Sequence, residues 1–219
     1  MRRARGGINM MLRGTKTKSV FGDDVEVVEV EVYTCKENGD EVELGRLDTV
    51  FLPAYDVDGN PYMLSELYDA ECQTCADLYP VIFNKKGELR KGLTDLGGPA
   101  SVFLIRGGKF KDEYVTKELV QAAVLGACAA FGRGAELVVV AGWYGLVYDK
   151  NARVANELAG GELLDDHDKT WAEMGFEKLN DVFYAFDTAC VEGVQRKDIE
   201  AKLVQHLENV AEGGLDTVT

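Results

Sequence analysis

The 219-residue sequence has few histidines and no long apolar run. Its longest apolar stretch, around residues 137–141, is far shorter than the roughly 20 residues that cross a bilayer, so we expect no membrane span. With only His167 and His206, and no GxSxG motif, a serine or cysteine nucleophile has few possible bases. A GxxxxGK[ST] phosphate loop and a GxGxxG fingerprint are also missing. Motifs alone therefore name no reaction.

Basic residues are fewer than acidic ones, 24 against 38, which gives a net charge of -14. This charge argues against nucleic-acid binding, which needs clustered lysine and arginine. Residues 1–21 are the exception, with six basic residues and no acidic one. Because this segment lacks apolar periodicity, we expect a flexible basic N-terminal arm. Such an arm suits nucleic acid, an anionic membrane or an acidic partner. Organellar targeting peptides are usually rich in serine as well as arginine, and this segment has a single serine, which disfavours that role.

The five cysteines form an odd number, and no secretory leader precedes them. This pattern predicts reduced thiols in a cytoplasmic protein. Cys72 and Cys75 form the only CxxC pair, and a structural zinc site needs a second pair of ligands. A redox pair is expected at a helix start after a strand, whereas this one falls inside a predicted helix on its apolar face. We therefore expect buried, inert thiols.

The densest polar cluster is Asp165, Asp166, His167 and Asp168. Consecutive residues point in divergent directions, so one metal ion does not easily collect all four. A helix cap with a negative first turn explains the cluster more simply. We expect no metal site here.

The first half of the chain predicts a hairpin and a helix. Alternating valine and glutamate over residues 25–33 indicates a strand with one wet face. Asn38-Gly39 predicts a type I′ turn into a return strand at residues 41–47, which residues 49–52 extend or follow. A long helix is expected from Asn60-Pro61 to Tyr79, ending before Pro80.

The second half alternates strands and helices. Residues 100–106 indicate a buried strand, after which Gly107-Gly108 permits a turn or bulge. A helix capped by Thr116 is expected to reach Phe131. The continuous apolar run 137–141 predicts a central strand covered on both faces.

Short helices near residues 151–158 and 168–174 are expected next, the latter stopping at Gly175. A strand follows at residues 182–186, and residues 198–210 predict an amphipathic helix. The pattern predicts an α/β (α+β) fold, in which helices flank a central mixed sheet and an extra helix lies at the C-terminus.

From residue 100 to residue 187, this order and spacing resembles the GNAT superfamily of N-acetyltransferases. The junction FGRGAELVV at residues 131–139 and the WAEMGF segment at residues 171–176 carry much of the resemblance. It implies a GNAT-like domain over residues 22–190, between the basic arm at residues 1–21 and a C-terminal helical extension at residues 191–219.

The resemblance also implies an acetyl-CoA site between strands 102–105 and 137–140. In the family, backbone amides at the start of the long helix hold the pyrophosphate. The matching amides here belong to Val115, Thr116, Lys117, Glu118, Leu119 and Val120. Val115, Glu118 and Val120 depart from the family motif R/Q-x-x-G-x-G/A. The Glu118 carboxylate would repel the phosphates, and Lys117 offsets part of that charge.

Two catalytic positions of the family are also altered. The family often has a glutamate base on the strand before this turn, where the present sequence reads Arg-Gly-Gly-Lys at residues 106–109 and offers Asp112 and Glu113 as the nearest carboxylates. The tyrosine acid of the family corresponds to Trp171, for which core packing is expected. Tyr144 and Tyr148 are then the candidate acids, and Glu113 the candidate base.

Two functions follow from the resemblance. The first is transfer of an acetyl group from acetyl-CoA to an amine by a divergent cytoplasmic acyltransferase. The second is an inactive GNAT-fold module that binds a protein partner through its C-terminal helix or basic arm. The sequence leaves open whether the protein is an enzyme.

Overall fold

The computed structural model describes residues 10–19, 22–36, 38–56, 58, 63–93, 99–111, 113–141 and 167–187. The strands are β1 (Met11–Ser19), β2 (Gly22–Cys35), β3 (Glu41–Leu52), β4 (Val102–Phe110), β5 (Leu137–Ala141), β6 (Glu177–Lys178) and β7 (Phe183–Asp187). The helices are α1 (Leu64–Glu71), α2 (Gln73–Ile82), α3 (Lys117–Phe131) and α7 (His167–Glu173). Together they confirm a mixed α/β fold with helices flanking a central sheet.

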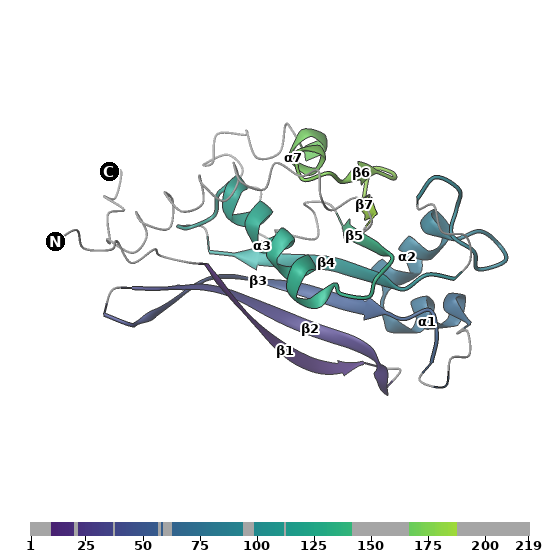
Figure 1. Cartoon of the computed structure of the whole chain (residues 1–219), viewed down its shortest axis with the longest axis horizontal. Coiled ribbons are helices and arrows are strands. Elements are labelled where there is room, and N and C mark those ends of the chain that lie inside the picture. Colours follow the sequence, from purple (N-terminus) through teal and green to yellow (C-terminus); the bar gives the residue numbers. More distant parts are fainter. Residues whose placement is uncertain are drawn as a thin grey trace.

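The described strands form one sheet in the order β1-β2-β3-β4-β5-β7-β6. The pair β4–β5 is parallel, and the other five pairs are antiparallel. α3 runs from the end of β4 to the start of β5, as a parallel pair requires a crossover connection. Figure 1 shows this helix lying across the sheet.

The β2–β3 hairpin is confirmed, but the type I′ turn is wrong. The Lys36 carbonyl accepts the Gly39 N–H at 2.9 Å, and the Lys36 N–H donates to the Asp40 carbonyl at 2.9 Å. Gly39 has φ +87°, whereas no described non-glycine residue has a positive φ, so Asn38 does not adopt the conformation that type I′ needs. The Asn38 Oδ1 instead accepts the Asp40 N–H at 3.0 Å and fixes the turn from its side chain.

The expected flexible arm is wrong for Met11–Ser19, which form β1 at the edge of the sheet. Arg13 lies opposite Glu31 in the register with β2. Its guanidinium reaches Glu31 at 3.4 Å and Glu41 at 2.8 Å, and it lies 4.7 Å from the centre of the Tyr33 ring. Opposite charges on neighbouring strands stabilise the pairing. The strand is therefore indicated by basic residues that face glutamates on the neighbouring strands, and it forms without apolar periodicity.

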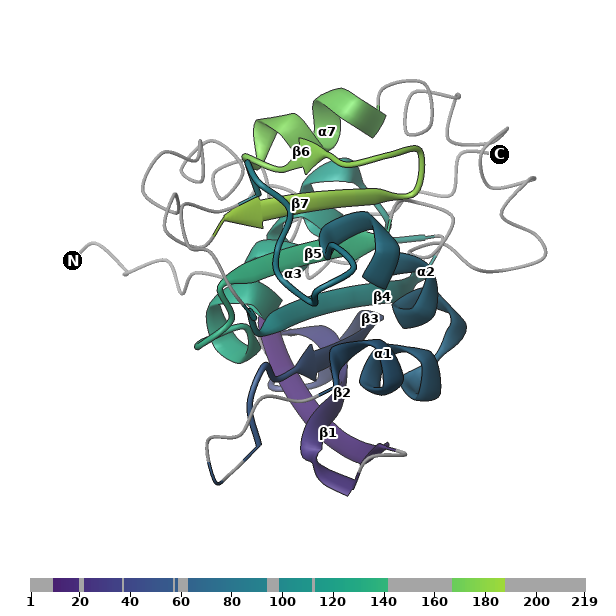
Figure 2. The same cartoon turned by 90° about the vertical axis from the view of Figure 1, so that its right-hand side faces the viewer.

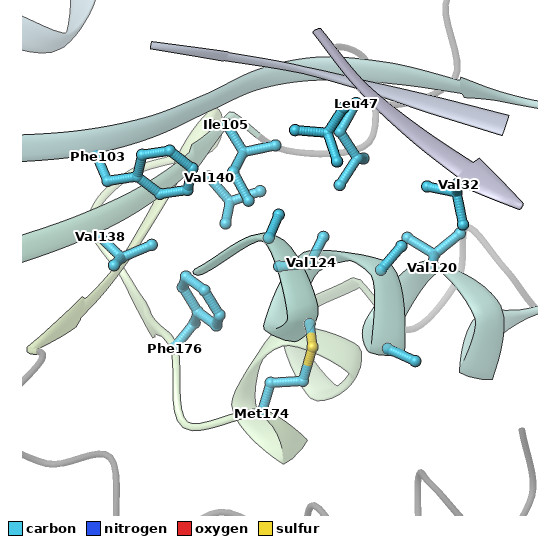
Figure 3. Close-up of a cluster of buried hydrophobic side chains, with 14 of the residues drawn as sticks. Val32, Leu47, Phe103, Ile105, Val120, Val124, Val138, Val140, Met174 and Phe176 are labelled. Atoms are coloured by element: carbon cyan, nitrogen blue, oxygen red, sulfur yellow. The ribbon is translucent and has the colours of Figure 1, made fainter. Parts of the chain in front are cut away.

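Two hydrophobic clusters lie on opposite faces of the sheet, because successive side chains of a strand alternate. Phe103 and Ile105 of β4 pack toward α3 and α7, while Val102 and Leu104 pack toward α1 and α2. Figure 2 shows α1 and α2 in front of the sheet and α3 behind it. Figure 3 shows strand side chains and those of α3 meeting in the first cluster.

The single helix expected up to Tyr79 is wrong, because the chain breaks at Cys72 into α1 and α2. Cys72 has an extended backbone, with φ -170° and ψ 165°, and occupies the N-cap of α2. Pro80 lies inside α2, close to its C-terminal end. Proline lacks a backbone N–H, and the helix continues for only two residues beyond it, so little of the helix is affected. The expected cap at Asn60-Pro61 lies outside the described residues.

The elements of the second half agree with expectation. α3 ends at Phe131 as predicted, every residue of β5 is buried, and Gly175, with φ +88°, follows α7. The helices expected at residues 151–158 and 198–210, and the extension at residues 191–219, lie outside the described residues. In the described part of the chain, no helix combines the length and apolarity needed to cross a membrane.

Candidate active site

The parallel strands β4 and β5 separate at their carboxyl ends. Their parallel pairing runs from Val102–Leu137 to Ile105–Val140 and then stops, although β4 continues to Phe110. On its other side, β4 contains a bulge, because Thr49 of β3 pairs with Ile105 and Asp48 pairs with Gly107. Arg106 is thus the additional residue. The bulge confirms one of the two alternatives that the Gly107-Gly108 pair permits.

A cleft of about 1160 Å³ opens where these strands part. Six consecutive residues, 106–111, line it from β4 and the position after β4. The other described walls are residues 45–48 of β3, the first half of α2 through Cys72, Thr74 and Asp77, and residues 181–184 at the start of β7; Glu29, Glu43 and Ala141 complete them. The cleft mixes carboxylates with arginine and lysine, so it suits a polar or zwitterionic ligand.

Arg106 is the charged centre of this cleft. Its guanidinium contacts Asp48 at 2.8 Å and Glu71 at 3.5 Å, and only 17% of its side chain is exposed. Its buried Nε finds no hydrogen-bond partner among the residues that the structure describes. Burial lowers the pKa of Arg106, but hydrogen bonding and charge from Asp48 and Cys72 outweigh burial and raise it. Arg106 is therefore a fixed cation with one donor unused.

Cys72 and Cys75 do not behave as the expected pair of inert thiols. Their sulfur atoms are 3.2 Å apart, and the Cys72 sulfur accepts the Cys75 N–H at 3.4 Å. The hydrogen bond from the Cys75 thiol, together with the Cys75 amide and Arg106, outweighs burial, which acts to raise the pKa, and lowers the pKa of Cys72 to about 5. The hydrogen bond to Cys72, followed by burial, raises the pKa of Cys75. Of the two, only Cys75 is buried as expected.

The predicted phosphate-binding amides lie at the start of α3, and three of them already have partners. The N–H groups of Val115 and Val120 donate to the carbonyls of Lys111 and Thr116. The N–H of Leu119 donates to the Thr116 hydroxyl at 3.2 Å, which confirms Thr116 as the cap. Of the first helical turn, this leaves the amides of Lys117 and Glu118 for an anion.

Lys117 turns toward α7 and away from the role expected of it. Its ammonium lies 2.8 Å from the Glu173 carboxylate, which also accepts from Gln121 at 3.2 Å. Gln121 donates further to the Thr170 carbonyl at 3.1 Å. These contacts join the first turns of α3 to α7. The Lys117 ammonium is paired with Glu173, so it does not offset the charge of Glu118 as expected.

The predicted catalytic residues are not brought together in the described structure. Glu113 is exposed in the turn before α3 and is not among the described residues lining the cleft. Tyr144 and Tyr148 lie outside the described residues. Trp171 is fully buried, with its ring centre 5.7 Å from Phe176 and 5.9 Å from Tyr184, which confirms core packing.

The acidic cluster divides between described and undescribed positions. His167 begins α7 and Asp168 lies in its first turn, in agreement with the expected helix start. The Asp168 carboxylate accepts the Tyr184 hydroxyl at 2.7 Å and the Lys178 ammonium at 3.2 Å. Asp165 and Asp166 lie outside the described residues. Among the residues that are described, no cluster of histidine, cysteine and carboxylate side chains could hold a metal ion.

Comparison with protein-family models, with curated proteins and with solved structures gives no match to this chain. A functional assignment therefore depends on the cleft, its side chains and the arrangement of the elements around it.

Proposed function

We propose that this protein is a divergent GNAT-like acyltransferase that transfers an acetyl group from acetyl-CoA to an amine in the cleft. The observation that carries the proposal is a parallel strand pair, joined through α3, which separates after Ile105–Val140 and opens into a cleft of about 1160 Å³. The GNAT resemblance of residues 100–187 supports a position for acetyl-CoA between these two strands. Ligands of open α/β sheets bind outside the carboxyl ends of such strands.

The backbone of β4 supplies a binding edge for the thioester. Beyond Ile105, no described strand pairs with β4 on the side of β5, and residues 106–111 all line the cleft. Backbone N–H groups on an unpaired strand edge are available to a ligand carbonyl. We assign to this edge the carbonyl oxygen of the acyl group, which gains negative charge when the amine attacks.

The acidic side chains of the cleft favour a cationic amine. Asp48, Asp77 and Asp181 line it together with Glu29 and Glu43. Asp48 lies opposite Gly107, beside the bulge. It is about half exposed, so a water molecule reaches it. We assign Asp48, in place of the sequence candidate Glu113, the proton that the amine loses, transferred directly or through one water.

Calorimetric titration with acetyl-CoA tests the cofactor site. We expect wild-type protein to bind in the micromolar range, and Glu118→Gln to bind roughly three- to tenfold more tightly because a carboxylate is removed from the α3 amides. Glu66→Gln is the matched control, since Glu66 is an exposed glutamate in the first turn of α1. Its affinity should equal that of the wild type. Absence of binding in the wild type and in Glu118→Gln would overturn the proposal.

Asp48→Asn tests the assigned base. We expect unchanged acetyl-CoA affinity and a fall in the acetylation rate of a panel of primary amines by about 10²- to 10⁴-fold. Asp77→Asn is the control, because Asp77 lines the same cleft from α2 and receives the Gln73 amide at 2.8 Å. An equal loss in both variants would indicate general charge attraction and would remove Asp48 from the assignment.

A second candidate, an inactive GNAT-fold module, is favoured by the state of the α3 amides. Those of Val115, Leu119 and Val120 are engaged within the chain, which leaves a small anion site next to the Glu118 carboxylate. This candidate predicts no acetyl-CoA binding by the wild type. It also predicts that removing residues 191–219, or residues 1–9 with β1 left in place, abolishes assembly with a protein partner, as measured by light scattering.

A further inference from the structure

The two cysteines at the start of α2 lie in a geometry close to that of a disulfide. Both thiols are free, and their sulfur atoms are 3.2 Å apart, whereas a disulfide bond measures about 2.05 Å. Cys72 occupies the N-cap and Cys75 lies three residues further, within the first turn of α2. A small side-chain rotation is enough to join the two sulfurs without unwinding the helix.

The two thiols differ in access. Cys72 is partly exposed and lines the cleft, whereas Cys75 is completely buried. A small molecule in the cleft thus meets Cys72 first, and Cys75 is reached only through Cys72. This order of access matches a pair in which Cys72 is the attacking cysteine and Cys75 is the resolving cysteine.

The surroundings of Cys72 favour its thiolate. Its sulfur accepts hydrogen bonds from the Cys75 thiol and the Cys75 amide, and the Arg106 guanidinium adds a positive charge. Arg106 comes from the β4 bulge, on a different element from the cysteines. A thiolate is the reactive form of cysteine in nucleophilic attack on a disulfide.

Cys128 of α3 shows that this environment is specific. Burial raises its pKa to about 12, and it packs with the cluster between α3 and the sheet. Within the described part of the chain, no cation or second sulfur lowers the pKa of this thiol. Cys128 therefore provides an internal reference for an unreactive cysteine.

We propose that Cys72 and Cys75 are a redox-active dithiol that exchanges with low-molecular-weight disulfides entering the cleft. The inference is independent of the acyltransferase proposal, because it requires neither acyl-CoA nor an amine. It reverses the interpretation of this CxxC as two inert thiols inside a helix.

The exchange balances in two steps. The Cys72 thiolate attacks one sulfur of the small disulfide, forms a mixed disulfide and releases the other half as a thiolate. Cys75 then loses its proton to that thiolate or to water and attacks the Cys72 sulfur. The Cys72–Cys75 disulfide forms, and the second half leaves. One small disulfide is reduced to two thiols, and the protein dithiol is oxidised.

The first step prepares the second. The hydrogen bond with Cys72 is the largest cause that raises the pKa of Cys75, and the negative charge of Cys72 contributes further. A mixed disulfide at Cys72 carries no charge and accepts that bond weakly, so burial remains as the main opposing cause. Cys75 thus becomes easier to ionise when its attack is required.

Incubation in buffers with varied ratios of reduced to oxidised glutathione tests the proposal directly. After acid quenching, alkylation and trypsin digestion, one peptide, residues 47–85, holds both cysteines. We expect this peptide to lose two hydrogens and to resist alkylation in oxidising buffer, with full recovery in reducing buffer. The peptides with Cys35 and Cys128 serve as references and should stay alkylated. A dithiol that remains fully alkylated at every ratio would overturn the proposal.

Single substitutions separate the two roles. Cys75→Ser should stop at a glutathione adduct on Cys72, because no resolving thiol remains. Cys72→Ser should give no adduct on Cys75, which glutathione cannot reach. Cys128→Ser is the control and should behave like the wild type. Equal adduct formation on Cys75 in Cys72→Ser would contradict the assigned order of attack.

An alkylation profile against pH needs no substitution. The wild-type rate of Cys72 with iodoacetamide should have its midpoint near pH 5, matching the pKa of about 5. At about pH 6 it should exceed that of an unfolded cysteine by roughly tenfold, since the larger thiolate fraction outweighs the lower nucleophilicity. A midpoint near pH 8 to 9, typical of a free thiol, would overturn the proposal even if every variant failed to fold.

Discussion

The two faces of the sheet are covered in different ways. On one face, the 15-residue helix α3 packs the small residues Ala122, Ala123 and Ala127 against β4 and β5, with Trp171 of α7 beside them. On the other face, the shorter α1 and α2 cover one part of the sheet, and their junction at Cys72 borders the cleft. One face is a continuous apolar layer, and the other combines an apolar layer with a polar opening.

This difference separates a face that stabilises the fold from a face that borders the cleft. Covering by one long helix gives close packing of apolar groups. Covering by two short helices creates an internal helix end, which supplies an N-cap and free N–H groups at the cleft. The reactive thiol and the fixed Arg106 cation belong to the second face.

Trp171→Ala should have the largest effect, because it breaks the apolar face. Trp171 is fully buried between Phe176 and Tyr184, and such truncations cost about 3 to 5 kcal/mol of unfolding free energy. Urea unfolding followed by circular dichroism measures the loss. Val182→Ala is the control, since Val182 is 51% exposed. A loss below about 1 kcal/mol in Trp171→Ala would contradict the assignment of this face as the packed core.

Gly45→Ala tests the close approach of β3 and β4 beside the cleft. A Cβ at Gly45 would lie 2.7 Å from the Lys109 carbonyl oxygen and 2.8 Å from the Phe110 Cα. Backbone must therefore shift, at a cost of about 1 to 3 kcal/mol. Gly126→Ala is the matched control. Its Cβ would meet flexible side-chain ends and no backbone, with Leu12 at 2.8 Å and Met10 at 3.6 Å, and a helix favours alanine. Equal stability of the two variants in urea unfolding would refute this close approach.

Glu173→Gln tests the polar contact between α3 and α7. The pKa of Glu173 is lowered, first by its hydrogen bond with Lys117, so the folded state favours the carboxylate. This stabilisation is present above the ordinary pKa of 4.5 and is lost as the pH falls through the lowered value. We expect the variant to be about 0.5 kcal/mol less stable than the wild type at pH 7. The difference should shrink as the pH falls below 4.5, and a difference independent of pH would indicate a packing effect.

Arg13→Ala should have the smallest effect, at the edge of the sheet. The guanidinium pairs with Glu31 and Glu41, but its side chain is 49% exposed, so solvent screens the attraction. The thermal midpoint should fall slightly in low salt and match the wild type at about 1 M salt, where the Debye length is roughly 3 Å. An undiminished difference in high salt would point to the contact with the Tyr33 ring instead.

The regular elements of the fold could be predicted because their signals are local. The β2–β3 hairpin follows from alternation and an Asn-Gly turn, and α3 from its Thr116 cap and small residues. β5 follows from an unbroken apolar run between glycines. Each of these signals lies within the element that it predicts.

The parts that were missed depend on contacts between distant residues. β1 is held by charge pairing with β2 and β3, which no pattern inside residues 11–19 reveals. The break at Cys72 places a cysteine sulfur as a helix cap, a role usually filled by serine, threonine, aspartate or asparagine. Arg106 lies 34 positions after Cys72 in the sequence, and it acts on the Cys72 sulfur because the bulge in β4 brings it there.

The bulge at Arg106 also sets the phase of β4. Before it, the odd-numbered Phe103 and Ile105 face α3; after it, the even-numbered Phe110 joins the same cluster. One added residue has exchanged the two faces, as a shift of one position does in any strand. Deleting Arg106 itself would remove the bulge and leave Phe110 opposite Gly45 in the core, whereas deleting one residue between the bulge and Phe110 would turn Phe110 to the other face. Between the bulge and Phe110, the number of residues therefore matters as much as their type, because it decides which face of the sheet each side chain joins.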